Sequence, residues 1–174
     1  MAEMEVVLSE AEIAARVREL GAAISGDYAG RSLVVVGILN GAFIFLADLV
    51  RAIDLPIVVD FIRVASYGDA TSSCGTVRCT KEVEVELAGK DVLLVEDIVD
   101  SGRTVASLIK MLARSQASSV RLCALIDKRE RREVEVTVDY PGFVVEEGFL
   151  VGYGLDFAGQ HRHYPAVFRI VNPE

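Results

Sequence analysis

A polar segment with the sequence EDIVDSGRT, residues 96–104, follows a run of four apolar residues at 92–95. Behind the segment, apolar residues recur with the i, i+3, i+4, i+7 spacing of an amphipathic helix. They are Val105, Leu108, Ile109 and Leu112. This stretch is therefore predicted to run from a buried strand through a polar loop into a helix. A strand that is apolar throughout is typical of a parallel sheet covered on both faces.

The same alternation of strand and helix patterns continues along the chain. Ser9 and Glu12 match a capping box before a helical stripe of apolar residues that ends at Ile24. A second helix is predicted at 42–53, and a polar loop at 67–75. Strands are predicted at 33–39, 57–65, 77–87, 120–126, 134–138, 142–145, 149–151 and 166–171. We expect an α/β fold with a parallel-rich central sheet flanked by helices, in a single domain spanning 1–174.

In such a sheet, ligands bind outside the carboxyl ends of the strands, so the loops after Leu39, Val95 and Ile126 should share one rim. The residues that open the helix after the polar segment, 101–104, supply backbone N–H groups and two hydroxyls where the helix dipole favours an anion. Such a helix start predicts a phosphate site.

Individual side chains refine this site. Gly102 permits a positive φ and close backbone approach, and Arg103 can donate charge-assisted hydrogen bonds to phosphate. Glu96 and Asp97 suit vicinal hydroxyls or a hard cation. The segment therefore predicts a site for a phosphorylated sugar. The alternative is that Asp97 and Asp100 are only turn and N-cap residues.

With the apolar run before it, EDIVDSGRT resembles the 5-phosphoribosyl-1-pyrophosphate (PRPP) motif of type I phosphoribosyltransferases. Further segments, in the order of that family, narrow the resemblance to the hypoxanthine-guanine phosphoribosyltransferases. They are GILNGA at 37–42, SYG at 66–68, Lys128, and FLVGYGLD at 149–156. The resemblance covers about residues 33–170 and implies the type I phosphoribosyltransferase fold, with a small hood formed by the terminal segments.

The resemblance also implies an activity. The phosphoribosyl group passes from PRPP to N9 of hypoxanthine or guanine, giving IMP or GMP and pyrophosphate with Mg²⁺ in purine salvage. Within the motif, Glu96 and Asp97 would bind the ribose hydroxyls, and Asp100 would act as general base near the purine N7. The 5′-phosphate would lie in the loop formed by Ser101, Gly102, Arg103 and Thr104, and Asp100, directly before that loop, is included among the PRPP-binding residues.

Two other segments match the family's pyrophosphate-binding residues. Leu39, Asn40 and Gly41 resemble the loop whose backbone amides hold the leaving group, and Arg162 matches an arginine that binds pyrophosphate. The chain departs from the pattern at Asn40, where many relatives carry lysine, so a side-chain cation is absent there. On residue chemistry alone, Asn40-Gly41 is also an ordinary turn pair.

Three residues resemble the purine-binding residues of the family. Lys128 would donate to the purine O6, Phe149 would stack on the ring, and the backbone of Leu150 would read the base edge. Without the resemblance, a lysine in the basic cluster at 128–132 would be interpreted as solvated, and Phe149 as core.

Mg²⁺ binding is implied for Asp156, with Glu96 and Asp97 as further candidate ligands, and the Asp156 backbone would lie near the purine 2-position. Ser66 and Tyr67 resemble residues of a lid that excludes water from the reacting centre. A solvated surface loop would have a similar composition to this lid.

The formal net charge of −8 disfavours a nucleic-acid binder, which usually presents a basic face. No apolar run approaches the length of a membrane span, and the N-terminus shows no signal-peptide pattern. Three cysteines without metal spacing indicate a reducing compartment. We expect a cytoplasmic protein that binds PRPP and a 6-oxopurine base, and the resemblance implies a homodimer or homotetramer.

Rival functions within the fold are a phosphoribosyltransferase for adenine or uracil, an RNA-binding attenuation regulator, a DNA-binding repressor and an inactive family member. Lys128 and the 149–156 segment disfavour the first, and the acidic balance disfavours the regulator. The repressor needs a further domain. All the acidic site residues are present, which disfavours the inactive member.

Overall fold

The computed structural model describes residues 3–65 and 78–171; the predicted lid residues Ser66 and Tyr67, and Cys74, lie outside this part. The helices of the described part are α1 (Glu10–Asp27), α2 (Phe43–Ala52) and α3 (Arg103–Ala113). Its strands are β1 (Glu3–Leu8), β2 (Leu33–Leu39), β3 (Ile57–Ala65), β4 (Arg78–Lys81), β5 (Asp91–Val99), β6 (Ser119–Lys128), β7 (Tyr140–Val145), β8 (Phe149–Val151) and β9 (Val167–Val171).

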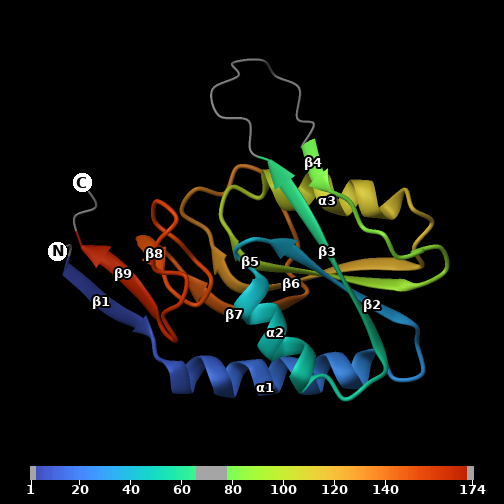
Figure 1. Cartoon of the computed structure of the whole chain (residues 1–174), viewed down its shortest axis with the longest axis horizontal. Helices are drawn as coiled ribbons and strands as arrows, with labels where there is room; N and C mark the ends of the chain where they lie inside the picture. Colours follow the sequence, from blue (N-terminus) through green and yellow to red (C-terminus); the bar gives the residue numbers. More distant parts are fainter. Residues whose placement is uncertain (1–2, 66–77, 172–174) are drawn as a thin grey trace.

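A six-stranded sheet in the order β4-β3-β2-β5-β6-β7 forms the centre of the molecule (Figure 1). In this order, β3, β2, β5, β6 and β7 each pair in parallel with the next strand, and β4 is antiparallel to β3. α1 and α2 cover one face of the sheet, whereas α3 packs on the other. The expected α/β fold, with a parallel-rich sheet flanked by helices, is confirmed.

The apolar strands divide their side chains between two cores, because successive residues of a strand point to opposite faces. Val35 and Leu93 lie in the core shared with α1 and α2. Val34 and Leu94, their neighbours along the strands, lie in the core shared with α3. β2 and β5 are therefore buried on both faces, as their continuous apolar sequence predicts.

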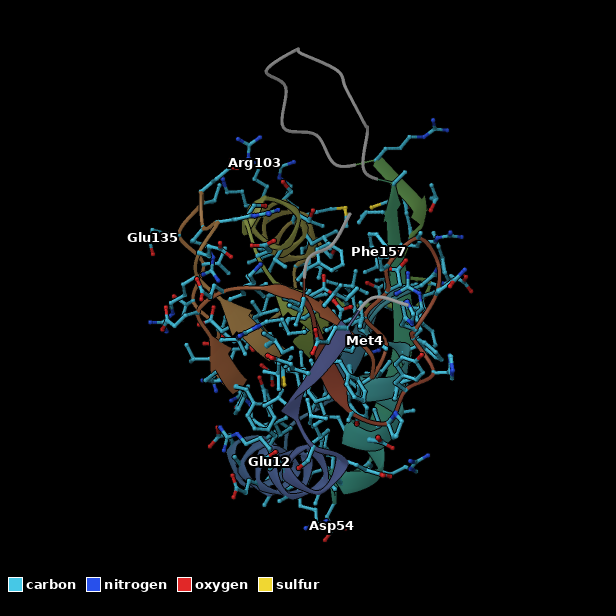
Figure 2. The ribbon with its side chains drawn as sticks, turned by 90° about the vertical axis from the view of Figure 1, so that its left-hand side faces the viewer. Met4, Glu12, Asp54, Arg103, Glu135 and Phe157 are labelled. Atoms are coloured by element: carbon cyan, nitrogen blue, oxygen red, sulfur yellow. The ribbon has the colours of Figure 1, made fainter. Side chains whose placement is uncertain are left out.

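The predicted hood is a second, antiparallel sheet in the order β1-β9-β8, built from segments near both ends of the chain. It lies at one end of the molecule (Figure 1). Figure 2, viewed from that end, shows α1 and α3 nearly end-on below and above the sheet. No helix of the described residues combines the length and apolar character needed to cross a membrane.

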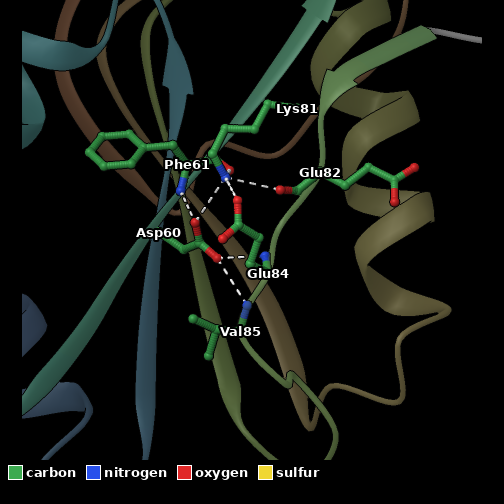
Figure 3. A network of polar contacts seen from close by, with 6 residues as sticks. All are labelled: Asp60, Phe61, Lys81, Glu82, Glu84 and Val85. Carbon is green, nitrogen blue, oxygen red and sulfur yellow. Dashed lines mark hydrogen bonds and ion pairs between the residues drawn. The ribbon is translucent and has the colours of Figure 1, made fainter.

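The strand predicted at 77–87 is too long, because β4 ends at Lys81. Beyond it, the N–H groups of Glu84 and Val85 donate to Oδ2 of Asp60, at 2.7 and 3.0 Å, instead of pairing with a strand (Figure 3). Asp60 is buried and also accepts from Lys81 Nζ at 3.3 Å and from the Phe61 N–H at 2.7 Å. Beyond Lys81, the Asp60 carboxylate thus takes the place of the backbone pairing between β3 and β4.

The strand predicted at 134–138 is absent, since that segment has no regular secondary structure in the structure. Its first N–H group, on Val134, donates to the Ser101 carbonyl at 3.0 Å, as does the N–H of Glu133. The segment therefore packs on the loop after β5 and does not extend the sheet.

Candidate active site

A cavity of about 490 Å³ lies between the carboxyl ends of β5 and β6 and the hood. Six residues predicted from the sequence line it: Asp97, Asp100, Lys128, Phe149, Leu150 and Asp156. Ile98, Glu130, Arg131, Gly148, Leu155 and Ile170 complete the lining. The rim expected from a parallel sheet thus carries residues from four separate segments.

Glu96 and Asp97 form a buried acidic pair at the end of β5. The Asp97 N–H donates to Oε1 of Glu96 at 3.0 Å, and the Ile98 N–H donates to Oδ1 of Asp97 at 2.7 Å. Burial and the neighbouring Asp97 charge raise the pKa of Glu96 well above its usual value. Burial also raises the pKa of Asp97, although Glu96, backbone N–H groups and Arg162 oppose that rise. The pair therefore favours holding a proton.

Asp100 follows β5 and borders the cavity. Its Oδ1 atom is buried and has no hydrogen-bond partner among the described residues. The N-cap of α3 is Gly102, with φ +82°, so Asp100 does not cap the helix and that interpretation is wrong. A buried acceptor without a partner is costly and is usually explained by an absent ligand, water or catalytic role.

The predicted phosphate loop is held from behind by the segment after β6. The Ser101 carbonyl accepts the N–H groups of Glu133 and Val134, both at 3.0 Å. A Cβ atom added at Gly102 would lie 2.5 Å from the Val134 carbonyl oxygen, so only glycine allows this approach. Ser101 Oγ accepts the Arg103 N–H at 3.3 Å. The exposed Arg103 side chain pairs with Glu133, and Thr104 lies in the first turn of α3.

The predicted pyrophosphate loop packs directly on the acidic pair. The bond between Leu39 and Asn40 is cis, and the Asn40 side chain is exposed. A Cβ atom at Gly41 would lie 1.9 Å from Oδ2 of Asp97, and one at Gly154 would lie 2.1 Å from the Gly41 carbonyl oxygen. The loop after β2 therefore meets both β5 and the segment that precedes Asp156.

Arg162 joins this group from the other side. Its Nη1 donates to the Gly154 carbonyl at 2.5 Å, and its Nη2 pairs with Oδ1 of Asp156 at 2.7 Å. Oδ2 of Asp156 accepts the Gly159 N–H at 2.8 Å. The structure thus brings the predicted pyrophosphate residues and the predicted Mg²⁺ aspartate together.

Lys128 ends β6 with only 6% of its surface exposed, so the solvated-lysine interpretation is wrong. Its Nζ atom pairs with Glu130 at 3.3 Å. Phe149 is 38% exposed and meets Phe157 edge-on, with ring centroids 5.2 Å apart, so it is not a core residue. The buried Leu150 pairs through its backbone with β9. These three residues line one cavity.

The sequence reasoning missed Glu130 and Arg131 in the cavity wall and the contacts of Arg132 behind it. All three follow Lys128 closely, and the sequence pattern there indicated only a solvated basic cluster. These residues directly follow the carboxyl end of β6, where ligands of parallel sheets bind, and this position could have indicated a role at the site.

The residues present fit a Mg²⁺ ion that is shared with a substrate pyrophosphate. Among residues 3–65 and 78–171 there is no group of three or more His, Cys, Asp or Glu side chains that could form a protein-only metal site. Mg²⁺ commonly uses one or two carboxylates and takes its other ligands from phosphates and water. Asp156 and Asp97 both border the cavity, and each carries a carboxylate.

Comparison with known proteins identifies the family. A family model described as the phosphoribosyl transferase domain matches residues 5–158. The hypoxanthine phosphoribosyltransferase of Salmonella typhimurium is 44% identical over 170 residues, which cover 97% of this chain and 96% of that protein. That of Haemophilus influenzae is 41% identical over 174 residues, covering 98% and 97% of the two chains.

Solved structures agree. A hypoxanthine-guanine phosphoribosyltransferase from Bacillus anthracis, with a HEPES molecule in its active site, superposes with a TM-score of 0.92 at 37% identity, covering 98% of this chain and 100% of that one. A hypoxanthine phosphoribosyltransferase from Staphylococcus aureus gives 0.92 at 37% identity, covering 96% and 91%. The chain therefore belongs to the hypoxanthine phosphoribosyltransferases, the purine-salvage pentosyltransferases of the phosphoribosyl transferase domain family.

Proposed function

We propose that this chain transfers the 5-phosphoribosyl group from PRPP to N9 of hypoxanthine or guanine, giving IMP or GMP and pyrophosphate. The observation that carries the proposal is the single cavity bordered by Asp100, Lys128 and Phe149, next to the buried Glu96–Asp97 pair. An acceptor for a proton, a donor for an oxo group, an aromatic face and acceptors for hydroxyls are the groups that this reaction needs.

PRPP would bind along the loop that joins β5 to α3. Its 5′-phosphate meets the N–H groups and hydroxyls of residues 101–104 at the helix N-terminus, where the dipole favours the anion. Its ribose hydroxyls meet Glu96 and Asp97. The two bonds from Glu133 and Val134 to the Ser101 carbonyl support this loop from the side away from the ligand.

The pyrophosphate would lie between residues 39–41 and Arg162. Gly41 is in contact with Asp97, and Arg162 is paired with Asp156, so the leaving group would meet the same residues that hold the cation. Mg²⁺, held by Asp156 with Asp97 and Glu96 as further candidates, would neutralise charge on the leaving pyrophosphate. Asn40 can offer its backbone amide but no cation.

The purine would stack on Phe149 with O6 at Lys128 and with its edge at the Leu150 backbone. A 6-amino purine would present a donor to the Lys128 ammonium group, which has no acceptor to offer it. The free Oδ1 of Asp100 would accept the N7 proton while N9 attacks C1 of the ribose. General-base assistance of this kind typically contributes about 10²–10⁴-fold, and positioning contributes more.

The lid and the assembly are further parts of the proposal. Ser66 and Tyr67 would close over the reacting ribose and exclude water. Phe43, Val58 and Val59 on α2 and β3 are large apolar side chains exposed in the single chain, which supports assembly into a homodimer or homotetramer. Light scattering coupled to gel filtration tests this, and a monomeric mass would refute it.

The central experiment is a spectrophotometric assay with Mg²⁺, PRPP and each purine in turn. We expect nucleotide formation with hypoxanthine, guanine or both, and none with adenine. Product with adenine alone, or none with any 6-oxopurine, would overturn the proposed function.

A further inference from the structure

We propose that Arg132 is a positioning residue that ties the PRPP loop to the purine-binding strand end, so that the two substrates meet at the correct distance. The inference rests on the proposed function. Arg132 lies outside the cavity wall and has only 14% of its side chain exposed. Its role would therefore be carried out from behind the site.

The contacts of Arg132 cross from one strand end to the other. Its Nε donates to the Asp100 carbonyl at 2.9 Å, and its Nη2 to the Val99 carbonyl at 3.2 Å. The same Nη2 donates to the Lys128 carbonyl at 3.0 Å. One side chain thus binds the backbone of both the proposed general base and the proposed O6 donor.

The guanidinium makes these bonds from two nitrogens, Nε to the Asp100 carbonyl and Nη2 to the Val99 and Lys128 carbonyls. Its donors are held in a rigid planar fork, whereas a lysine ammonium is a compact point charge that cannot place donors at both positions. Asp127, whose side chain is 6% exposed, pairs with Arg132 at 2.5 Å and compensates its charge. A buried pair of this kind is unfavourable unless hydrogen bonds satisfy it, and the three carbonyls do so.

The side chain of Asp100 needs such support from its backbone. Its Oδ1 atom has no partner among the described residues, so no hydrogen bond at that oxygen orients the carboxylate. The Val99 and Asp100 carbonyls, which accept hydrogen bonds from Arg132, belong to the backbone from which this carboxylate extends. A displacement of about 1 Å in such a site can cost about 10²-fold in rate.

Arg129 offers a matched control. It pairs with Oδ2 of the same Asp127, at 3.2 Å, while Arg132 pairs with Oδ1. Its side chain is 61% exposed, and its side-chain bonds to the residues that the structure describes are both to Asp127. Arg129→Met therefore removes one charge from the same carboxylate and leaves the bonds to the three carbonyls intact.

The test compares a ligand that spans both strand ends with one that uses a single loop. IMP would contact the PRPP loop and the purine site, whereas ribose 5-phosphate would contact the PRPP loop alone. In Arg132→Met we expect the affinity for IMP and the kcat each to fall about 10-fold or more. The affinity for ribose 5-phosphate should stay within about 3-fold, because the Ser101 carbonyl keeps its bonds to Glu133 and Val134.

Arg132→Lys keeps the charge and loses the fork, so it should show the same separation between the two ligands, and Arg129→Met should show none. Isothermal calorimetry and steady-state kinetics measure these values, with thermal unfolding as a check of folding. Equal losses for IMP and ribose 5-phosphate, equal effects in the Arg129 variant, or failure of both Arg132 variants to fold would overturn the proposal. Wild-type turnover, measured first, tests the proposed function separately.

Discussion

Gly41 and Asp97 are in such close contact that a Cβ atom on Gly41 would lie 1.9 Å from Oδ2 and 2.6 Å from Cγ of the aspartate. The loop after β2 and the acidic end of β5 thus occupy positions that depend on the absence of one side chain. A displacement of the loop would displace Asp97, and the reverse, because packed groups cannot overlap. The geometry of the proposed ribose site therefore depends on that of the proposed pyrophosphate site.

Gly41→Ala should accordingly displace Asp97 or the loop, and lower kcat/KM for PRPP by about 10-fold or more. Gly26→Ala is the control, since a Cβ atom at Gly26 in α1 meets nothing within 4 Å. That change should leave kinetics unaltered and raise the free energy of unfolding by up to about 1 kcal/mol. Unchanged kinetics in Gly41→Ala would contradict the close contact.

Asp100→Asn should lower kcat by about 10²–10⁴-fold, because the amide cannot take up the purine proton. PRPP binding should change little, since residues 101–104 and the acidic pair are untouched. The measurement pairs steady-state kcat with a PRPP dissociation constant from calorimetry. Normal turnover would eliminate Asp100 as the general base, and a parallel loss of PRPP binding would indicate a structural defect of the loop.

Glu96→Gln should make the ligand-free protein more stable than the wild type at neutral and alkaline pH. The raised pKa of Glu96 means that the folded state favours its protonated form. The contribution of Glu96 to the free energy of unfolding of the wild type is therefore fully present below the unfolded pKa of about 4.3. It is lost as pH rises through the raised folded pKa. Glutamine mimics the protonated acid and is insensitive to pH.

Urea unfolding of both proteins between pH 5 and pH 8 checks this expectation. The wild type should lose unfolding free energy relative to Glu96→Gln as pH rises. The exposed Glu5→Gln serves as the control, because it removes a solvent-exposed acid of β1 and leaves the buried pair unchanged. Parallel pH curves for the wild type and Glu96→Gln would argue against a proton on the buried pair.

Asp60→Asn should destabilise the fold by about 2 kcal/mol, since the carboxylate accepts three backbone N–H groups and the Lys81 ammonium. Burial by itself would raise the pKa of Asp60, but these bonds outweigh it and lower the pKa. The stabilisation is present above the unfolded pKa of about 3.9 and is lost as pH falls through the folded pKa.

Urea unfolding at pH 7 and pH 3 measures the effect. At pH 7 the variant should have a lower free energy of unfolding than the wild type. Between pH 7 and pH 3 this free energy should fall less in the variant than in the wild type. The exposed Asp54→Asn, at the bottom edge of the molecule in Figure 2, provides the reference. A neutral Asp60→Asn would show that the network in Figure 3 contributes no net stability.

Local patterns predicted β5 and α3 well, because their buried residues follow the regular spacing of a strand buried on both faces and of an amphipathic helix. The apolar run at 92–95 is buried on both faces, and Val105, Leu108 and Leu112 face the sheet. The hood strand β1 left no comparable signal, since it is half of a pairing whose other half, β9, lies at the opposite end of the chain.

Residues 82–87 show why alternation can mislead. Their apolar side chains turn inward and their glutamates outward, as in a strand, yet the backbone N–H groups of Glu84 and Val85 are captured by Asp60. Likewise, the buried Lys128 pairs with Glu130 and lines a cavity together with residues of the hood. Such contacts between distant segments are not encoded in a local period, so the sequence alone predicted the residues but not their environments.

The buried Glu96–Asp97 pair has a consequence for the thermodynamics of binding. If the ligand-free pair retains a proton, then ribose hydroxyls and a cation that require two ionised acceptors must expel it. Binding of PRPP would then release up to about one proton to the solvent. The observed heat of binding should vary with the ionisation enthalpy of the buffer, and the affinity for PRPP should increase with pH. Calorimetry in several buffers would then count the protons that PRPP binding releases.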